Sequence, residues 1–574
     1  MQWTFLDAVP EQALVEFPDI ARPAADALFH RGITSADGVR RFLNPDYLRD
    51  LPDPFLFFDM ERTVARLYDA LEKKEPILIH GDYDADGICA TAILASVFRA
   101  FGGKVLTFLP TRHEDGYGVS TRAVEQAMKS GVRVLITADC GIAAHEPLAR
   151  ATAAGIDVII TDHHRVGATV PDAFAILHPL RDGERYPDQT LTGGGVALKL
   201  AQGLIRSSMP LHRRYREGRT PVMGWEAFEK WLLDLAAIST IADCSRMVGE
   251  SRAIVSFGLI ALRKTLRPGL RALYARARIE DKPLTEDTIR FSIAPRINAT
   301  GRLRDPKLSL ELLLAEDTER AERVAGEIEA LNTERQQLTH AAVAEVQEEL
   351  ATNVPPMVFA YREHWNVGLI SLLASRFAHQ FARPAFVLAK HRDELVGSAR
   401  GVDGFDCVEF LEGARSCLKR FGGHTRAAGF TLAPEHYESF RAAVSEHQPP
   451  PAAEEQNIAI DSILRLNEAD QALATVVEHF APFGEGNSEP IFVSKGLRLT
   501  NMRRVGKSGS HLQAVLTEGS GGTTVRSVGF GMGDRFTSLL SGLVDVAFHL
   551  RRDTWNGNER VQAVIVDMKH SNDS

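Results

Sequence analysis

The sequence predicts an α/β protein with a parallel, doubly wound sheet, a second α/β unit that follows a long helix, and a C-terminal β-barrel. Three observations support this prediction. Short apolar runs alternate with helical segments between residues 76 and 161, as in a parallel sheet. Residues 310–350 are rich in Leu, Glu, Ala, Arg and Gln, which favours one long helix. After residue 456, short strands are separated by Gly and Asn turns, as in a small barrel.

Length and composition indicate an ordinary globular chain. Its 574 residues correspond to roughly three or four domains of about 150 residues each. No apolar run approaches the length of a membrane span. The N-terminus lacks a basic segment followed by an apolar one, and the five cysteines have neither paired nor zinc-like spacing. We therefore expect a cytoplasmic protein.

The net charge of −9 argues mildly against a nucleic-acid partner, although an acidic protein can still contain basic grooves. Two Arg-rich runs, 213–219 and 263–278, are either such grooves or solvated faces.

Domain boundaries and elements follow from these patterns. We expect an N-terminal helical region (1–75), the parallel-sheet domain (76–308), the connecting helix (309–350), the second α/β unit (351–446), a linker (447–456) and the barrel (457–574). Within the sheet domain we predict strand 77–79, helix 88–101, strand 104–109, helix 120–130, strand 132–138, helix 144–154 and strand 156–161.

The stretch His80-Gly81-Asp82-Tyr83-Asp84-Ala85-Asp86-Gly87 follows the first predicted strand. An imidazole and three carboxylates therefore emerge at the carboxyl end of a buried strand, where open α/β sheets bind ligands. Three aspartates at alternate positions repel one another unless a cation lies among them. A solvated acidic turn is the alternative, because Asp and Gly also favour turns.

Aspartate and histidine residues also follow two more of the predicted strands. Asp139 follows strand 132–138, and Asp162, His163 and His164 follow strand 156–161. Because parallel strands end side by side, we expect all these side chains at one rim of the sheet.

A later apolar segment ends at Asp243, which can point back at this rim. Asp234, inside the same segment, is expected to be a buried and hydrogen-bonded structural residue. Carboxylates mixed with imidazoles suit Mn²⁺ or Mg²⁺, and two such ions together can hydrolyse a phosphodiester.

These four motifs resemble the DHH phosphoesterase superfamily. The resemblance covers nearly the whole chain and is to the bacterial exonucleases that degrade single-stranded DNA from 5′ to 3′. It implies two ions, Mn²⁺ or Mg²⁺, one held by His80, Asp84 and Asp139 and the other by Asp86, Asp139, His163 and Asp243. By the same resemblance, His164 would face the scissile phosphate, and Asp82 would lie behind the metal ligands or on the substrate side. We count Asp162, together with His164 and Asp82, among the expected catalytic residues.

Other segments are candidates for substrate binding. Arg112 and Tyr117, in the loop after the second strand, could clamp a phosphate and stack on a base, or simply belong to a surface turn. Thr192-Gly193-Gly194-Gly195 precedes a helix and could cradle phosphate or permit close helix packing. The stretch 294–303 is similar to a hallmark of these exonucleases except at Ala294 and Thr300. It implies that Asn298 lies near the metals and that Arg302 grips phosphate.

The second α/β unit, with predicted strands 357–361 and 383–388, resembles the DHH-associated domain. The resemblance implies that Ser398 and Arg400 bind a 5′-terminal phosphate and that His424 lies near the nucleotide. Relatives have Trp-His where this chain has Trp365-Asn366, which leaves His364 without an assigned role.

The resemblance also makes the C-terminal barrel an OB-fold, an architecture that binds single strands. Lys507, His511 and Trp555 are candidate contacts there. A single-strand-binding protein and a helicase are implied as partners, and recombination and repair as the setting.

Three functions remain open at this point. The first is a 5′-to-3′ exonuclease on single-stranded DNA. The second is a phosphodiesterase on short RNA or cyclic dinucleotides, which the barrel and the N-terminal region suit less well. The third is a non-catalytic DNA-binding scaffold, which has no need to gather so much negative charge.

Overall fold

The structure is a computed structural model that describes residues 2–111, 115–116, 118–351, 353–449, 457–506, 509–519, 522–533, 542–553 and 560–571. The chain divides into two compact units. The larger comprises Pro52–Ser245 and Phe257–Glu454, and the smaller comprises Met1–Leu51, Arg246–Ser256 and Glu455–Ser574. None of the described helices is both long and apolar enough to cross a bilayer.

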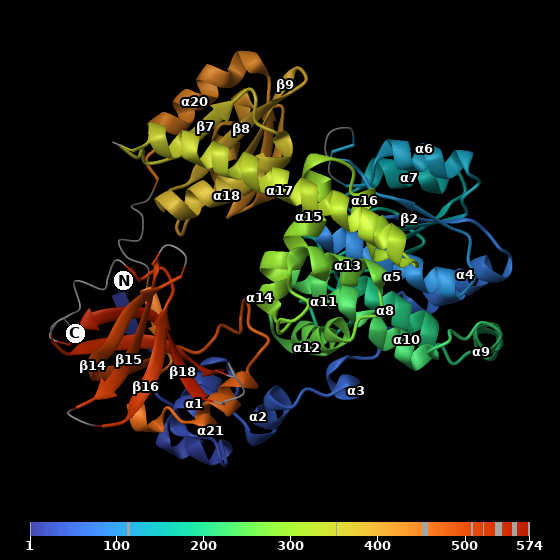
Figure 1. The fold of residues 1–574 in the computed structure, drawn as a ribbon. Coiled ribbons are helices and arrows are strands. Elements are labelled where there is room, and N and C mark those ends of the chain that lie inside the picture. Colours follow the sequence, from blue (N-terminus) through green and yellow to red (C-terminus); the bar gives the residue numbers. More distant parts are fainter. Residues whose placement is uncertain are drawn as a thin grey trace. The chain divides into compact units, whose positions relative to one another are not determined.

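The larger unit contains a five-stranded sheet in the order β3-β2-β4-β5-β6, in which every neighbouring pair is parallel. Figure 1 labels strand β2 of this sheet. The strands are β2 (Ile77–His80), β3 (Val105–Phe108), β4 (Val134–Ala138), β5 (Asp157–Thr161) and β6 (Ala175–Leu177). Strand β2 is buried along its whole length, as expected for a parallel sheet covered on both faces. The predicted parallel sheet is confirmed.

Helices cover both faces of this sheet. Leu78 and Leu135 share a core with α6 (Thr121–Lys129) and α7 (His145–Ala153), whereas α5 (Ala85–Ala100) and α8 (Gly193–Arg206) pack against each other and against the strands. The domain also contains α4 (Met60–Glu72), α9 (Pro210–Glu217), α10 (Trp225–Trp231), α11 (Leu233–Ala242), α13 (Pro268–Ala277), α14 (Glu286–Thr288), a π-helical turn (Ile289–Ile293), α15 (Ala294–Leu303) and α16 (Lys307–Leu313). Helix α12 (Gly249–Arg263) is divided, because its residues up to Ser256 belong to the smaller unit.

The long helix begins later than predicted. Helix α16 ends at Leu313, and α17 (Thr318–Glu349) starts after a short break. Asp317 caps α17, because its side chain accepts a hydrogen bond from the Arg320 N–H at 2.8 Å. At 32 residues, α17 is still the long helix that the composition predicts.

The second α/β domain of the larger unit has the sheet order β10-β11-β9-β8-β7. Its elements are β7 (Val358–Arg362), α18 (Ile370–Phe381), β8 (Ala385–His391), β9 (Glu394–Arg400), α19 (Cys407–Gly413), β10 (Arg420–His424), β11 (Ala427–Leu432) and α20 (Tyr437–Glu446). Only the β7–β8 pair is parallel among these neighbouring strands.

The smaller unit is built on a five-stranded barrel. Its strands are β14 (Phe492–Val505), β15 (His511–Glu518), β16 (Thr524–Gly529), β18 (Arg560–His570) and β17 (Val544–Asp553), and pairing of β14 with β17 closes it. Helix α21 (Gln471–Glu478) packs on the barrel, and the short strand β13 (Ser462–Ile463) pairs in parallel with β14. The predicted C-terminal barrel is confirmed.

The N-terminal region does not form one helical domain. Residues up to Leu51 belong to the barrel unit, where β1 (Gln2–Phe5) pairs in parallel with β12 (Asn457–Ile460). Helices α1 (Arg22–His30), α2 (Ala36–Leu43) and α3 (Tyr47–Asp50) follow β1. Buried side chains from α1 and α2 contribute to the same core as the barrel strands, which explains why the unit boundary falls well before residue 75.

Part of the predicted sheet domain also belongs to the smaller unit. Arg252, near the start of α12, donates to the carbonyl oxygens of His479, Phe480 and Ala481 and lies over the ring of Phe42.

Candidate metal centre

The strand register brings three loops to one rim of the parallel sheet. His80 pairs with Thr137 across β2 and β4, and Ala138 pairs with Thr161 across β4 and β5. Asp82, Asp139 and Asp162 therefore each follow a strand that ends at the same level.

The first loop is shaped by close backbone packing. Asp84 caps α5, because its Oδ1 accepts hydrogen bonds from the N–H groups of Asp86 and Gly87 at 3.1 and 3.2 Å. A Cβ at Gly87 would lie 2.5 Å from the backbone nitrogen of Asp82, so only glycine fits there. The loop thus turns tightly enough to place Asp82, Asp84 and Asp86 together.

Asp139 lies at the centre of the cluster. It is buried and has the left-handed backbone angle φ of 66°, which few residues other than Gly, Asn and Asp adopt readily. Burial, and after it repulsion from Asp86, Asp84 and Asp82, raises the pKa of Asp139 well above its usual range.

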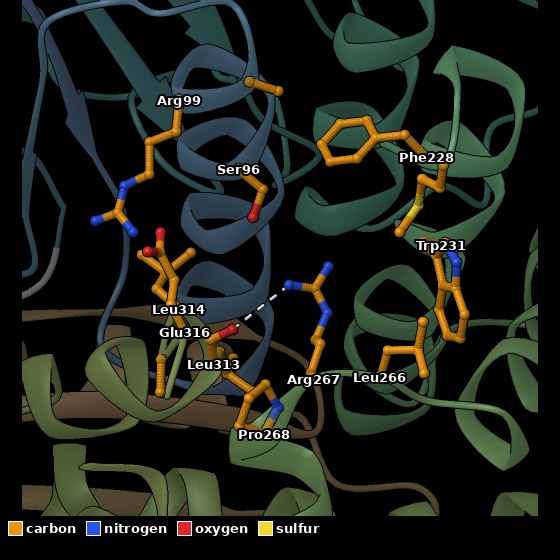
Figure 2. A pocket seen from close by; sticks show the side chains of 13 residues that line it. Ser96, Arg99, Phe228, Trp231, Leu266, Arg267, Pro268, Leu313, Leu314 and Glu316 are labelled. Atoms are coloured by element: carbon orange, nitrogen blue, oxygen red, sulfur yellow. Dashed lines mark hydrogen bonds between the residues drawn. The ribbon is translucent and has the colours of Figure 1, made fainter. Parts of the chain in front are cut away.

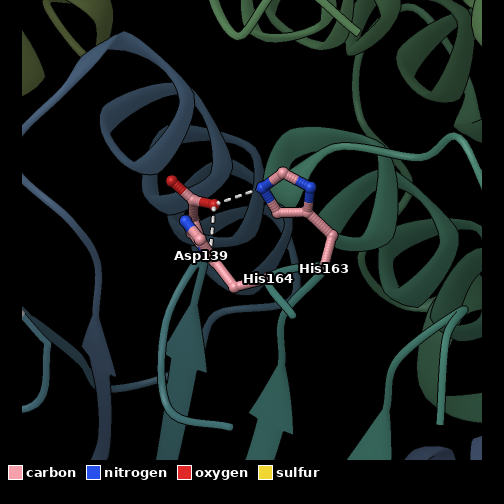
Figure 3. Close-up of side chains that lie close together, drawn as sticks. All are labelled: Asp139, His163 and His164. Carbon is pink, nitrogen blue, oxygen red and sulfur yellow. Dashed lines mark ion pairs between the residues drawn. The ribbon is translucent and has the colours of Figure 1, made fainter. Parts of the chain in front are cut away.

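His163 lies close to Asp139 and to two other acidic residues, and Figure 3 shows it beside Asp139. Its Nε2 atom lies 3.1 Å from Asp139 Oδ1, 3.5 Å from Asp86 Oδ2 and 3.9 Å from Asp243 Oδ2. Burial lowers the pKa of this imidazole, so His163 is available as a neutral ligand at neutral pH.

His164 is held by Asp162. The Asp162 carboxylate accepts hydrogen bonds from His164 Nδ1 at 2.8 Å and from the Ile142 N–H at 2.9 Å. Burial alone would raise the pKa of Asp162, but these bonds and the His164 charge lower it to about 2. Burial also disfavours a charged His164, but its bond to Asp162 raises the pKa of His164 to about 9. His164 is therefore a cation at neutral pH, with 38% of its side chain exposed.

Three groups of ligand atoms in the cluster are compact enough to hold a cation. They are Asp82, Asp84 and Asp139; Asp86, His163 and Asp243; and Asp139, His163 and His164. The first group differs from the predicted set, because it contains Asp82 where we expected His80.

His80 is instead part of the protein core. It is fully buried, its ring stacks on Phe108, and its Nε2 accepts a hydrogen bond from the Ser120 N–H at 3.3 Å. Its Nδ1 lies 3.6 Å from Cys140 Sγ. Both ring nitrogens thus have protein partners, and burial lowers the pKa of His80 to about 4.

The cluster fits divalent cations. Asp139 Oδ1 and His163 Nε2 lie 3.1 Å apart but form no hydrogen bond, and neither buried atom has another hydrogen-bond partner among the described residues. Such atoms are rare unless something else satisfies them. Burial, followed by repulsion from Asp86 and Asp84, raises the pKa of Asp243 to about 8, although 36% of its side chain is exposed. A cation would relieve this repulsion, and oxygen and imidazole donors suit Mn²⁺ and Mg²⁺.

These raised pKa values predict how ion binding depends on pH. A carboxyl group with a raised pKa keeps its proton at neutral pH, and a cation binds only the deprotonated form. The affinity of the metal-free protein for Mn²⁺ should therefore rise between pH 6 and pH 8, by up to roughly tenfold per unit for each proton released, and level off above about 8. Calorimetry in buffers of different ionisation enthalpy measures both affinity and protons released, and an affinity that stays constant over this range would contradict the prediction.

Asp86 accepts hydrogen bonds from the Thr192-Gly193-Gly194-Gly195 segment, for which the sequence left open whether it binds phosphate or permits close helix packing. The N–H groups of Gly193 and Gly194 donate to its two carboxylate oxygens at 2.9 and 2.8 Å, and the Ser239 hydroxyl donates at 2.5 Å. The glycine triplet at the start of α8 therefore contacts a carboxylate of the chain itself. Ser239 was not predicted as a site residue. The only feature in the sequence that could have indicated it is a hydroxyl side chain within the apolar segment before Asp243.

Helix α15 connects the first loop to the second α/β domain. The Asn298 side-chain oxygen accepts a hydrogen bond from the Ala85 N–H at 2.9 Å, which places Asn298 beside the acidic loop. Arg302, one turn later, donates to the carbonyl oxygen of Gly368 and the hydroxyl of Ser371, both at 3.1 Å. Arg302 thus binds the second α/β domain in this structure.

The other predicted substrate residues lie on the second sheet. Arg400, at the end of β9, donates to Ser375 Oγ at 2.9 Å and lies 3.4 Å from Ser398 Oγ. Ser398 is buried, whereas His424 is exposed at the end of β10. His364 lies 3.4 Å from Glu345 on α17.

Four candidates, Arg112, Tyr117, Lys507 and Trp555, lie outside the described residues. His511, on the barrel, packs edge-on against Phe530 and accepts a hydrogen bond from the Gly531 N–H.

A pocket of about 500 Å³ lies near the carboxyl end of α5, at the opposite end of that helix from Asp84 (Figure 2). Apolar side chains of Phe228, Trp231 and Leu266 line it together with Arg99, Arg267 and Glu316. None of the predicted site residues lines this pocket.

Comparison with known proteins identifies the class first. A family model described as the DHH family, N-terminal domain, matches residues 76–240, and the DHHA1 domain model matches residues 354–447. The parallel sheet, its acidic rim and the second α/β domain thus define a member of the DHH phosphoesterase superfamily. The RecJ OB domain model matches residues 460–567, which assigns the barrel as well.

Matches over most of the chain identify the family within this class. The single-stranded-DNA-specific exonuclease RecJ of Bacillus subtilis is 33% identical over 97% of this chain and 69% of its own length, and that of Salmonella typhimurium is 32% identical over 89% and 90%. The crystal structure of RecJ from Thermus thermophilus in complex with Mn²⁺ has a TM-score of 0.79 at 30% identity and covers 99% of this chain and 79% of that one. The complex of the same protein with Mg²⁺ has a TM-score of 0.73 at 28% identity, covering 99% and 78%. The chain belongs to the RecJ family.

Proposed function

We propose that this chain is a metal-dependent exonuclease that removes nucleotides from the 5′ end of single-stranded DNA. The observation that supports it most is Asp139, a buried carboxylate that forms a compact ligand group with Asp82 and Asp84. Its Oδ1 also lies 3.1 Å from His163, which belongs to the group with Asp86 and Asp243. Such a shared ligand is what a two-ion phosphodiesterase requires. The relatives that match over most of this chain are named single-stranded-DNA-specific exonucleases.

Asp82, Asp84 and Asp139 would hold one ion, and Asp86, Asp139, His163 and Asp243 the other. The first set is one of the compact groups of ligand atoms and contains Asp82 in place of the expected His80. The second is the compact group of Asp86, His163 and Asp243, to which we add Asp139 because its Oδ1 lies 3.1 Å from His163 Nε2. When bound, two divalent cations supply Lewis acidity for hydrolysis and neutralise charge that develops on the phosphate.

His164 would bind the scissile phosphate. Its exposed imidazolium can donate to a phosphate oxygen, because Asp162 holds the ring by the opposite side and maintains its charge. Asp162 would therefore be a positioning residue that acts through His164.

The second α/β domain would select the 5′ end. Ser398 and Arg400 lie two positions apart on β9, with the Arg400 guanidinium 3.4 Å from Ser398 Oγ, and could bind a terminal phosphate, with His424 near the nucleotide. Asn298 would orient the acidic loop, and Arg302 would either grip phosphate or hold the two domains together, as its bonds to Gly368 and Ser371 favour.

The barrel would bind the strand beyond the cleavage site, as OB-folds do. We further propose a role in recombination and repair, a cytoplasmic location, and a single-strand-binding protein and a helicase as partners. These follow from the family resemblance.

The two alternative functions are less well supported. A phosphodiesterase on short RNA or cyclic dinucleotides has no evident use for the barrel, which matches the RecJ OB domain model. A non-catalytic scaffold would not need a buried cluster whose carboxyl groups repel one another.

Digestion of 5′- and 3′-labelled single strands, duplex DNA and RNA in Mn²⁺ or EDTA tests the proposal. We expect single-stranded DNA to be shortened from its 5′ end in Mn²⁺ only. Cleavage in EDTA, release from the 3′ end first, or preference for short RNA or duplex would overturn it.

Replacement of Arg400 by Ala should reduce the preference for a 5′-phosphorylated end more than the general affinity for the strand. The guanidinium is expected to contribute about 1.5–3 kcal/mol to a charge-assisted contact with terminal phosphate, which is roughly tenfold or more in kcat/KM. The measurement compares kcat/KM on phosphorylated and unphosphorylated ends. The exposed Arg376 on α18 provides the matched control, and an equal loss on both ends would remove this assignment.

A further inference from the structure

Asp86 is held by donors from two helices that lie outside its own loop. Both of its carboxylate oxygens accept hydrogen bonds from outside its own loop: Gly193 N–H and Gly194 N–H from α8, and Ser239 Oγ from α11.

Ser239 is itself oriented by Thr192. The two hydroxyl oxygens lie 2.7 Å apart, and Thr192 Oγ1 also accepts a hydrogen bond from the Gly195 N–H as the cap of α8. Both side chains are fully buried. The hydroxyl pair therefore joins the first turn of α8 to α11 directly behind Asp86.

The glycines of α8 make this contact possible. A Cβ at Gly194 would lie 2.3 Å from Ser239 Oγ, and a Cβ at Gly193 would lie 2.3 Å from the Cβ of Asp139. Any larger residue would push α8 away from the cluster and remove the N–H donors from Asp86. The Thr-Gly-Gly-Gly segment thus has a role at the metal centre that does not involve a substrate phosphate.

We propose that Ser239 and Thr192, with the first turn of α8, form a preset cradle that positions Asp86 as a metal ligand. This inference rests on the proposed two-ion function. Hydrogen-bonded partners of ligating side chains fix ligand orientation and affect metal affinity. Here the donors also offset part of the negative charge that Asp86 brings beside Asp139 and Asp84, so the site can gather its carboxylates before an ion arrives.

The test is Mn²⁺ binding by Ser239→Ala in the full chain. The electron paramagnetic resonance signal of free Mn²⁺ disappears on binding, so titration reports each binding step without any DNA. We expect the step that uses Asp86 to weaken by about tenfold or more. The Mn²⁺ concentration for half-maximal exonuclease activity should rise by a similar factor, and the rate at saturating Mn²⁺ should recover to within about threefold.

Two matched variants separate positioning from packing. Thr240→Val removes the neighbouring buried hydroxyl, which donates to the Ala236 carbonyl within α11 and does not contact Asp86; its Mn²⁺ affinity should equal that of the unmodified chain. Thr192→Ser keeps the hydroxyl that faces Ser239 and should retain affinity, whereas Thr192→Val should lose it in the same direction as Ser239→Ala.

Mn²⁺ affinity of Ser239→Ala within twofold of the unmodified chain would overturn the cradle, and so would an equal loss in Thr240→Val. If the unmodified chain bound no Mn²⁺, both the cradle and the proposed function would fail. If the unmodified chain bound Mn²⁺ and Ser239→Ala bound it weakly, but neither degraded DNA, the exonuclease proposal would fail alone.

Discussion

Replacement of Asp139 by Ala should slow hydrolysis of single-stranded DNA by at least about a thousandfold, which is roughly 4 kcal/mol of transition-state stabilisation. Asp139 belongs to the compact ligand group with Asp82 and Asp84 and lies 3.1 Å from His163, a ligand proposed for the second ion, so its loss affects both proposed ions. Strand binding should persist, because the barrel and the second α/β domain are unchanged. Rates on labelled oligonucleotides and fluorescence anisotropy of the same strands measure the two effects separately.

A second variant controls for backbone strain at Asp139. The residue has a left-handed conformation, which Asn tolerates better than Ala. Asp139→Asn should therefore fold like the unmodified chain and still be inactive. Asp182→Ala, at an exposed position, should retain full activity. Activity in Asp139→Asn comparable to the unmodified chain would rule out the shared-ligand assignment.

Replacement of Arg267 by Ala should lower the free energy of unfolding by roughly 3–5 kcal/mol. Arg267 Nε lies 2.7 Å from the carboxylate of Asp234, which is fully buried in α11. Removal of the guanidinium leaves that carboxylate buried without its cation, and this costs more than the loss of an exposed ion pair. Urea denaturation of the metal-free chain measures the change.

The source of this loss can be separated from simple side-chain truncation. Arg276→Ala, at an exposed position of helix α13, should change stability by less than about 0.5 kcal/mol. Replacing both members of the pair, as Asp234→Leu with Arg267→Met, should recover most of the loss. A double variant as unstable as Arg267→Ala alone would contradict this explanation.

Much of the metal centre could be predicted from local sequence. Asp139 and Asp162 each follow an apolar strand, and parallel strands must end at a common rim, so the proximity of the three loops needs only the fold class. Asp234 could also be predicted as a buried structural residue, because it lies within an apolar helix that offers no water to its carboxylate.

The break before α17 could have been predicted from a local sequence pattern, which the amino-acid composition of the segment does not reveal. Asp317 followed by Thr318 is a typical cap and first residue of a helix, and the structure places the cap there. The position of residues up to Leu51 had no such signal. Strand β1 pairs with β12, more than 450 residues further along the chain, and no local pattern reports such a pairing.

The choice between His80 and Asp82 could not be made from the sequence. Both lie in the same loop motif at alternate positions and both are ordinary ligand types. Tertiary packing separates them, because Phe108, Ser120 and Cys140 come from three other segments and enclose the His80 ring.

The class of fold, the rim at which the acidic and imidazole side chains gather, and the resemblance to a family are all evident from the sequence alone. These depend on local properties, namely apolar runs, strand ends and short motifs. The packed fold was needed to show that Asp82 lies beside Asp84 and Asp139, and that the glycine triplet and Ser239 donate hydrogen bonds to Asp86. These hydrogen bonds join segments that are 40 to 153 residues apart in the chain. The donors and acceptors come within bonding distance only once the helices have packed, so no local stretch of sequence contains this information.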